Sequence, residues 1–307
     1  MPVWRTAVVL LAAAVTAAAP GTGPKTVRVS VWADGAEALD CRAPKARIDG
    51  LPARVVRALG PDDDLMMLGV LDLAGDLTLV DAAREALAAS IRRLPAKAHL
   101  GLLKAQEGLG VLVDPTADHA AVAQVIESHS PGGRAGLLDT IEEASRVGDL
   151  VLAKASVRLA IFYLTDSNIY NYREDFANPV INSSDGGDLS RRFPEGLVRE
   201  RISKLASALS TRQAPLFIVH LDYRSDRLNE AYQAGLLELA AATGGTAVFC
   251  RSTAEIPEAI GTLLQRVASH WGLDVELPAG RQRQVTIEID CGGRELNHRG
   301  RFLAREP

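Results

Sequence analysis

The sequence has little of several features that would point to particular classes of protein. It has no excess of basic residues, since 34 lysines and arginines stand against 38 aspartates and glutamates, for a formal net charge of −4. A protein that binds nucleic acid usually carries a basic face, and one held on anionic lipids needs a basic cluster. The composition therefore argues against nucleic acid or a membrane surface as the main partner.

The short motifs of nucleotide and metal enzymes are also missing. Neither a G-x-G-x-x-G turn nor a G-x-x-x-x-G-K-[ST] loop occurs, so we expect no nucleotide to bind. The six histidines are scattered without the spacing of metal ligands. A hydrolase using Asp72 and Asp166 as paired acids would need a nucleophile or a supporting histidine, which the sequence does not indicate. We therefore expect a protein without enzymatic activity.

Cysteine is scarce, with Cys41, Cys250 and Cys291 only and no C-x-x-C motif. Three cysteines allow one disulfide and one free thiol, and simple burial of all three is the alternative. If the β segments near the two ends of the chain pair with each other, Cys41 and Cys291 come within bridging distance. Cys250 follows a predicted buried strand and is then the free thiol.

Long apolar runs are absent after the first residues, which read MPVWRTAVVLLAAAVTAAAPG. Arg5, the apolar segment 6–14 and the small residues 15–17 form the pattern of a secretory signal peptide. We expect residues 1–17 to be removed and the protein to be secreted or to remain in the periplasm or cell envelope. A retained anchor is the alternative, although the apolar segment is short for a bilayer span. After cleavage we expect no stable membrane span.

The most apolar internal stretch runs from Leu65 to Leu73, LMMLGVLDL. A run without alternation favours a strand buried on both faces, as in a parallel sheet covered by helices. Asp72 comes at the end of this run, which places it at the carboxyl edge of the sheet. In open α/β sheets ligands bind at that edge.

Strands and helices alternate from residue 61 to residue 271, which predicts an α/β fold with a doubly wound, mainly parallel sheet and helices on both faces. Short β patterns occupy the flanks, residues 25–60 and 272–303, and predict a small β segment. The predicted strands after the first are 98–104, 109–113, 157–165, 215–221 and 246–250, and the pair 98–104 and 109–113 is expected to form an edge hairpin. The predicted helices are 118–128, a helix through 137–144, 198–209, 226–242 and an amphipathic stripe from Ile256 to Trp271.

A long polar segment, residues 167–194, follows the strand that ends at Asp166. A loop of this length in a compact domain is usually functional or without fixed structure. Its aromatic residues either contact a partner or pack on their own domain. We expect Ser167, Tyr170, Tyr172 and the loop residue Arg134 to contact a partner, and the segment to contribute little to stability.

Together these pieces resemble a von Willebrand factor A domain, and more closely the bacterial VWFA-related family, in which short β segments flank the A domain. The resemblance covers about residues 26–303. It rests on D-L-A-G-D at 72–76, the P-G-G loop at 131–133 before a helix carrying Asp139, L-T-D at 164–166, the stretch 228–249 and H-R-G-R-F at 298–302.

The resemblance implies a metal-ion-dependent adhesion site, in which the family uses a D-x-S-x-S loop, a threonine and an aspartate to bind a divalent cation through oxygen. Asp72 and Asp166 match the two aspartates, and Asp76 stands at the second serine. Ala74 and Ala135 replace the first serine and the threonine and supply no side-chain oxygen. The metal ligands expected are therefore Asp72, Asp76 and Asp166, in a degenerate site.

Three alternatives remain open at this site: Mg²⁺, an altered divalent site such as one for Ca²⁺, or no metal. Without a metal, Asp76 caps the following helix or Arg134 neutralises the carboxylates. The sequence thus indicates an exported, non-enzymatic binding or adhesion module that engages a protein or envelope partner at the carboxyl edge of its sheet. The alternative is a structural or interaction protein without a metal site, whose contacts are made by residues 167–194 or by the flanking β segments.

Overall fold

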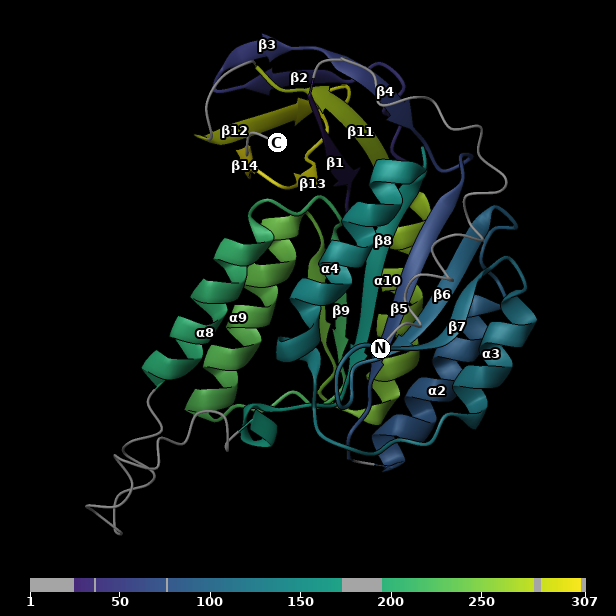
Figure 1. Cartoon of the computed structure of the whole chain (residues 1–307). Helices are drawn as coiled ribbons and strands as arrows, with labels where there is room; N and C mark the ends of the chain where they lie inside the picture. Colours follow the sequence, from purple (N-terminus) through teal and green to yellow (C-terminus); the bar gives the residue numbers. More distant parts are fainter. Residues whose placement is uncertain (1–24, 36, 76, 173–194, 279–282, 305–307) are drawn as a thin grey trace.

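The computed structural model describes residues 25–35, 37–75, 77–172, 195–278 and 283–304 (Figure 1). The expected signal peptide, residues 1–17, lies outside these ranges. A six-stranded sheet forms the centre of the molecule, in the order β10-β9-β8-β5-β6-β7. Its strands are β5 (Leu65–Asp72), β6 (Ala98–Lys104), β7 (Gly110–Thr116), β8 (Arg158–Thr165), β9 (Leu216–His220) and β10 (Thr246–Phe249).

Every neighbouring pair in the central sheet is parallel except β6 and β7. The predicted doubly wound, mainly parallel sheet is therefore confirmed, as is the hairpin at its edge. The helices that connect the strands are α2 (Leu77–Ile91), α3 (His119–Ser128), α4 (Leu137–Lys154), α8 (Glu195–Leu209), α9 (Arg227–Thr243) and α10 (Ile256–Ser269). Asp118 caps α3 by accepting the amide of Ala121, which agrees with the predicted start of that helix.

Helices cover both faces of the sheet, so its inner strands have no polar face (Figure 1). All eight residues of β5 are buried, and all eight of β8. Side chains alternate between two cores: Met67 and Leu71 pack with α2, α3 and α10, whereas Met66, Leu68 and Val70 pack with α4, α8 and α9. Burial on both sides explains why these strands read as continuous apolar runs in the sequence.

The two flanking segments form a β sandwich at one end of the central sheet (Figure 1). One small sheet has the order β13-β1-β11-β4 and the other β14-β12-β2-β3. Strands from both ends of the chain contribute to each sheet, which confirms that the flanks pair with each other. The strands are β1 (Thr26–Trp32), β2 (Lys45–Ile48), β3 (Leu51–Ala53), β4 (Val55–Leu59), β11 (Trp271–Glu276), β12 (Arg283–Asp290), β13 (Asn297–His298) and β14 (Arg301–Ala304).

The disulfide joins Cys41 to Cys291, as the pairing of the flanks predicts. In the antiparallel β2–β12 ladder, Lys45 is opposite Asp290. Cys41 lies four positions before Lys45, Cys291 directly follows Asp290, and the Cα atoms of the two cysteines are 4.9 Å apart. Cys250 is a buried free thiol, also as expected.

One boundary differs from the prediction: Trp271 does not continue the last helix. Helix α10 ends at Ser269, His270 adopts an extended backbone, and Trp271 begins β11, where it is opposite Val31 of β1. Its indole donates a hydrogen bond of 2.8 Å to the carbonyl of Leu39. Trp271 thus belongs to the core of the sandwich, although its spacing in the sequence continues the apolar stripe of the helix.

Buried arginines fasten the sandwich to the central sheet. Arg158, at the start of β8 and 1% exposed, donates to the carbonyls of Ala268, His270, Pro61 and Asp63. Burial lowers the pKa of Arg158 to about 10, which leaves the guanidinium charged at neutral pH. Its two terminal nitrogens are therefore satisfied by carbonyl groups that come from both flanks of the central α/β domain.

Arg299, in the H-R-G-R-F motif, is a second buried arginine that attaches the sandwich to the central domain. Its guanidinium donates to the carbonyls of Ser210 and Arg212, which follow the end of α8, and to Arg301. A cation at the end of a helix also interacts favourably with the helix dipole. The motif that carries part of the sequence resemblance therefore has a structural role in joining β14 to α8.

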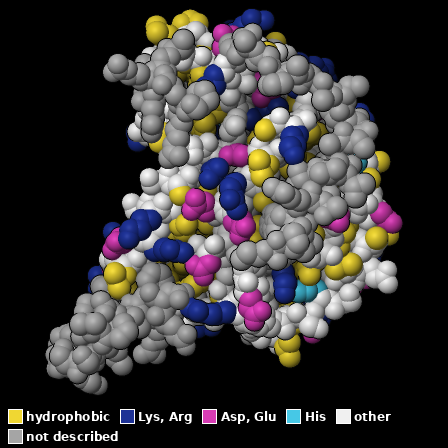
Figure 2. All heavy atoms as spheres, viewed as in Figure 1, with side chains coloured by type: hydrophobic (Ala, Val, Ile, Leu, Met, Phe, Trp, Pro, Cys, Tyr) yellow, Lys and Arg dark blue, Asp and Glu magenta, His cyan; other side chains and the backbone are white. Residues whose placement is uncertain are grey.

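The outer helices carry mixed charge. Figure 2 shows basic and acidic side chains interspersed on the face that α4 and α8 form. Several of them pair, including Arg201 with Asp139 and Lys204 with Glu200. This face has none of the one-sign character of a nucleic-acid surface. Within the described ranges, no helix is both long and apolar enough to span a bilayer.

Candidate functional site

The candidate site lies where β5 and β8 end, at the edge of the central sheet opposite the sandwich (Figure 1). Asp72, the last residue of β5, is fully buried. Its Oδ1 accepts the backbone amide of Gly136 at 2.8 Å, and its Oδ2 accepts the hydroxyl of Thr165 at 2.8 Å. The carboxylate thus ties β5 both to the start of α4 and to the end of β8.

Asp166, which directly follows β8, binds the loop that follows β5. One carboxylate oxygen accepts the amide of Ala74 at 2.7 Å and the other accepts the amide of Gly75 at 2.8 Å. The loop before α4 is also attached, because Gly132 donates its amide to the carbonyl of Leu73 at 3.1 Å. The three loops that the family resemblance brings together are therefore adjacent in the structure, and hydrogen bonds to backbone amides hold them.

The close approach of these loops requires glycine at position 136. A Cβ atom built there would lie 1.9 Å from the carbonyl oxygen of Ala105. Any side chain would push α4 away from the end of β6 and would displace the amide whose hydrogen bond Asp72 accepts. Gly136 is thus a constraint on the site that the sequence reading did not identify.

A chain of buried hydroxyls extends from Asp72 into the core. Ser167 lies 2.6 Å from Thr165 and 3.2 Å from the hydroxyl of Tyr232, measured between oxygens. An ionised Asp72 can only accept, so Thr165 donates to it, Ser167 donates to Thr165, and Tyr232 donates to Ser167. His220, which is fully buried, donates from Nε2 to the carbonyl of Ser167 at 2.7 Å. The network gives every hydroxyl in the chain a partner.

Burial raises the pKa of Asp72 above the usual range of a carboxyl group. Desolvation is the largest cause, and the charge of Asp166 acts in the same direction. The hydrogen bonds from Gly136 and Thr165 act in the opposite direction, because they stabilise the ionised form, and the nearby hydroxyl of Ser167 adds to their effect. Burial also lowers the pKa of His220 to about 4, so its imidazole is neutral at physiological pH.

The residues predicted to contact a partner fall into two groups. Ser167 is fully buried in the hydroxyl network and Tyr172 is 1% exposed, so neither side chain offers a surface to a partner; these two predictions are wrong. Tyr172 instead packs against Tyr232, with ring centroids 6.1 Å apart, and its hydroxyl accepts the amide of Leu138. Arg134 and Tyr170 are exposed, and their contact with a partner remains a prediction.

Packing of Tyr172 follows from a short 3₁₀ helix, η2 (Ile169–Tyr172), at the beginning of the polar segment. Ile169 is fully buried, and Asn229 of α9 accepts its amide at 3.0 Å. Tyr170 points to solvent and donates its hydroxyl to Asp226 at 2.9 Å. The first residues of the segment therefore form part of the core, whereas residues 173–194 lie outside the described ranges.

The described carboxylates do not form an oxygen set that fits a divalent cation. All four oxygens of Asp72 and Asp166 accept hydrogen bonds from amides or a hydroxyl, and Mg²⁺ would have to displace such donors. Ala74 and Ala135 have no oxygen to offer. Asp76 lies outside the described residues. Among the described ones, no group of three or more carboxylate, histidine or cysteine side chains is arranged to hold a metal.

Two large apolar side chains are exposed beside the cluster. Leu77, the first residue of α2, is 63% exposed, and Tyr170 in η2 is 45% exposed. Leu77 follows the loop that Asp166 holds, and Tyr170 follows Asp166 itself. Exposed aromatic and aliphatic side chains next to a rigid polar cluster are typical of contact surfaces between proteins.

Comparison with known proteins gave matches among solved structures only; no family model and no curated protein matches this chain. A von Willebrand factor type A protein from Catenulispora acidiphila is 13% identical, with a TM-score of 0.45, over 92% of this chain and 74% of that one. The PilB minor pilin from Streptococcus sanguinis is 12% identical, with a TM-score of 0.49, over 67% and 61%. The vWF domain of the pili tip protein Mfa5 from Porphyromonas gingivalis is 12% identical, with a TM-score of 0.42, over 66% and 94%. The fold assignment rests on the strand order and not on these values.

Proposed function

We propose that this protein is an exported, non-enzymatic binding module that engages a protein, or another component of the cell envelope, at the carboxyl edge of its central sheet. The observation that carries the proposal is the cross-linking of three loops by Asp72 and Asp166 at that edge. A rigid platform of this kind suits recognition, because little freedom is lost when a partner binds. The same edge is the usual ligand site of open α/β sheets.

The geometry also supports a role without catalysis. The carboxylates of Asp72 and Asp166 are occupied by backbone amides and a hydroxyl, and Asp72 is fully buried. A general acid or base must reach the proton that it transfers. Neither group presents a free oxygen toward solvent in a way that a reacting substrate would require.

We propose further that the platform works without a resident cation, since hydrogen bonds already provide the cross-links that a metal would supply. Names of similar structures, a minor pilin and a pili tip protein, agree with an envelope location, although the proposal does not depend on them. The alternative is a structural or interaction protein whose contacts are made by residues 167–194 or by the flanking β segments. Contacts through the β segments predict a different set of sensitive residues, and the same experiment tests them.

The experiment is capture of partners from an envelope fraction by the immobilised protein, with matched variants. We expect the double variant Leu77→Ser, Tyr170→Ala to lose the captured protein while keeping the melting temperature of the wild type. Leu51→Ser is the control, because Leu51 is 71% exposed on β3 at the opposite end of the molecule (Figure 1). Loss of capture in Leu51→Ser, with capture retained in the double variant, would move the contact surface to the sandwich and contradict the proposal.

A further inference from the structure

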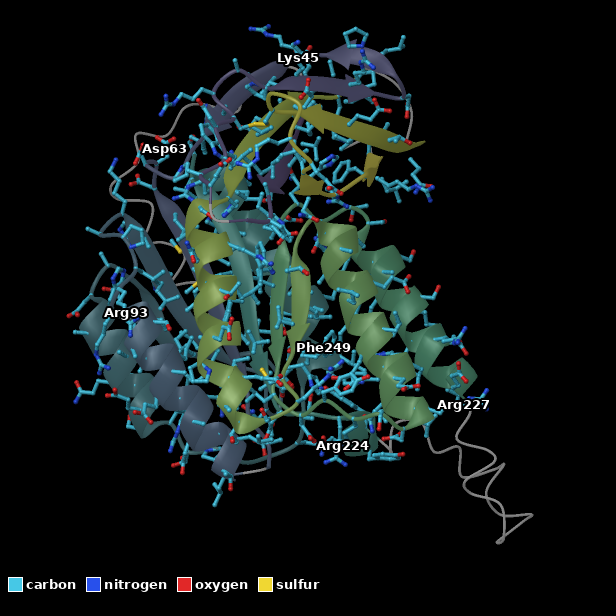
Figure 3. The ribbon with its side chains drawn as sticks, turned by 180° about the vertical axis from the view of Figure 1, so that it is seen from behind. Lys45, Asp63, Arg93, Arg224, Arg227 and Phe249 are labelled. Atoms are coloured by element: carbon cyan, nitrogen blue, oxygen red, sulfur yellow. A yellow bond between two sulfur atoms is a disulfide. The ribbon has the colours of Figure 1, made fainter. Side chains whose placement is uncertain are left out.

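A second arrangement at the carboxyl edge lies where β9 and β10 end. The guanidinium carbon of Arg251 lies 5.1 Å from the ring centroid of Tyr223. The Tyr223 ring meets the ring of Phe249 edge-on, with centroids 6.4 Å apart, and Phe249 lies 5.6 Å from the buried ring of His220. The stack therefore extends from the core to an exposed arginine. Figure 3 shows Phe249 and the neighbouring Arg224 at this end of the sheet.

The backbone beneath the stack is held in place by hydrogen bonds. Tyr223 donates its amide to the carbonyl of Cys250 at 3.0 Å, which joins the two loops. The side-chain amide of Gln233, 4% exposed, accepts the amide of Arg224 and donates to the carbonyl of Arg224, both at 2.9 Å. The loop that carries Tyr223 thus has its conformation before any ligand binds, so binding costs less conformational entropy.

The acidic side chains of the loops after β9 and β10 have partners other than the guanidinium of Arg251. Asp222 pairs with Arg224 at 2.7 Å, and Asp226 accepts the hydroxyl of Tyr170 and caps α9. Glu255 accepts the backbone amide of Arg251 at 2.8 Å with one carboxylate oxygen. Within the described ranges, the guanidinium of Arg251 makes no ion pair and no hydrogen bond. Its one aromatic contact there is with the ring of Tyr223. Five N–H donors are therefore available on an exposed, oriented guanidinium.

We propose that Arg251, supported by Tyr223, binds a carboxylate in an acidic segment of the protein partner. A ring below the guanidinium plane leaves the N–H groups at its edge free, and these match the two oxygens of a carboxylate. The inference rests on the proposed function, because it names the chemistry of the partner at the same edge. Glu255, which accepts the backbone amide of Arg251, adds a negative charge next to the arginine that disfavours a polyphosphate, so the site suits one carboxylate of a peptide.

The test is a titration of the ¹⁵N-labelled full chain with acetyl-Gly-Glu-Gly-Glu-Gly-amide, observed at the Nε–H resonance of Arg251 and the backbone amide of Tyr223. The reference is the same peptide with glutamine in place of glutamate. We expect saturable shifts with the acidic peptide only, weakened by added salt. In Arg251→Gln the affinity falls roughly tenfold or more, because a charge-assisted hydrogen bond is lost.

Two further variants make the test specific. Arg93→Gln is the matched control, since Arg93 is also exposed but lies beyond the end of α2, away from Arg224 and Phe249 (Figure 3). It should bind the acidic peptide as the wild type does. Arg251→Lys keeps the positive charge but loses the planar pair of N–H donors. Its affinity for the acidic peptide should lie between those of the wild type and Arg251→Gln.

Equal shifts with the glutamine peptide, or unchanged affinity in Arg251→Gln, would overturn the inference. Failure of the carboxylate-binding inference can be distinguished from failure of the proposed function. If capture of the envelope partner depends on Leu77 and Tyr170 but is unchanged in Arg251→Gln, the carboxylate site is wrong while the binding role stands. If the acidic peptide binds at Arg251 but capture is insensitive to every residue of the carboxyl edge, the binding role of that edge is wrong.

Discussion

The carboxylate of Asp166 accepts the backbone amide of Gly75 at 2.8 Å, and this contact joins the ends of two neighbouring strands. Its second oxygen accepts the amide of Ala74 in the same loop. In the metal-ion-dependent adhesion site that the sequence resemblance implies, an aspartate here would share a cation with the loop. Here the aspartate reaches the loop directly, which makes the arrangement of the carboxyl edge a property of the polypeptide itself.

The first prediction concerns this contact. Asp166→Ala leaves two amides without their acceptor and should lower the free energy of unfolding by about 1–3 kcal/mol. Asp139→Ala is the control, because Asp139 pairs with Arg201 on the surface, where both side chains are about half exposed, and its loss should cost at most about 0.5 kcal/mol. Urea unfolding at neutral pH measures both values. Equal effects of the two substitutions would show that the Asp166 contacts do not stabilise the fold.

The second prediction concerns pH and Asp72. Because burial raises its pKa in the folded state, the folded protein holds this proton to a higher pH than the unfolded chain does. Stability from this group is therefore greatest below the unfolded pKa of about 4 and decreases as pH rises through the folded pKa. Asp72→Asn removes that loss, since an amide oxygen still accepts the amide of Gly136 and Thr165 can accept from the amide nitrogen.

The measurement is the difference in unfolding free energy between Asp72→Asn and the wild type at pH 4 and pH 7. We expect the difference to shift in favour of Asp72→Asn as pH rises. Taking the difference removes the contribution of groups that titrate in both proteins, such as Asp149, because burial also raises the pKa of Asp149. A difference that moves toward the wild type with rising pH would mean that the ionised carboxylate is the stabilising form.

The third prediction concerns metal. A ligand that binds only the folded state raises the melting temperature, so millimolar Mg²⁺ should leave that of the wild type unchanged. Ala74→Ser, Asp76→Ser and Ala135→Thr together restore the hydroxyls of the family site and should create Mg²⁺ binding, detectable by calorimetry. A rise in the wild-type melting temperature with Mg²⁺ that Asp166→Ala abolishes would instead establish a native cation site.

The fourth prediction concerns the disulfide between Cys41 and Cys291, which closes the chain over a sequence separation of 250 residues. Cys41→Ser with Cys291→Ser should lower the free energy of unfolding by about 2–5 kcal/mol. Cys250 should react slowly with a thiol reagent until the protein unfolds, because burial raises its pKa to about 11 and hides it from solvent. Non-reducing peptide mapping checks the pairing, and any bridge that includes Cys250 would contradict it.

The fifth prediction separates two tyrosines at the start of the polar segment. Tyr172→Ala removes a fully buried ring and should lower the free energy of unfolding by about 3–5 kcal/mol. Tyr170→Ala should change it by less than about 1 kcal/mol, since Tyr170 is 45% exposed and loses one surface hydrogen bond. Thermal and urea unfolding compare the pair. Equal losses would mean that η2 as a whole is a structural element and that Tyr170 is not free to serve a partner.

The expectation that residues 167–194 contribute little to stability is therefore corrected for its first residues. Ser167, Ile169 and Tyr172 are buried, although polarity and length suggested an exposed loop. Nothing in the segment itself indicates this, because the groups that bury it come from α4 and α9. For residues 173–194 the prediction stands, and replacement of those residues alone by a Gly-Ser linker tests it.

Hydrophobic patterning alone was enough to predict most of the fold. The unbroken apolar run from Leu65 to Leu73 indicates burial on both faces, and the structure has β5 at the centre of its sheet. The pairing of Cys41 with Cys291 followed from the expectation that the flanks pair. Patterning failed at Trp271, because a residue after the end of a helix can continue its spacing by chance while the backbone has already become extended.

The sequence by itself determined the elements, their order and the position of Asp72 and Asp166 at the ends of two strands, because these follow from local periodicity. Tertiary structure decided what the two carboxylates bind. Their donors, Gly136, Thr165, Ala74 and Gly75, come from other loops or from a neighbouring strand. Such contacts depend on the register of β5 against β8, which places Asp72 opposite Thr165. The stack of Arg251 on Tyr223 has the same origin, since the parallel ladder of β9 and β10 brings their loops together.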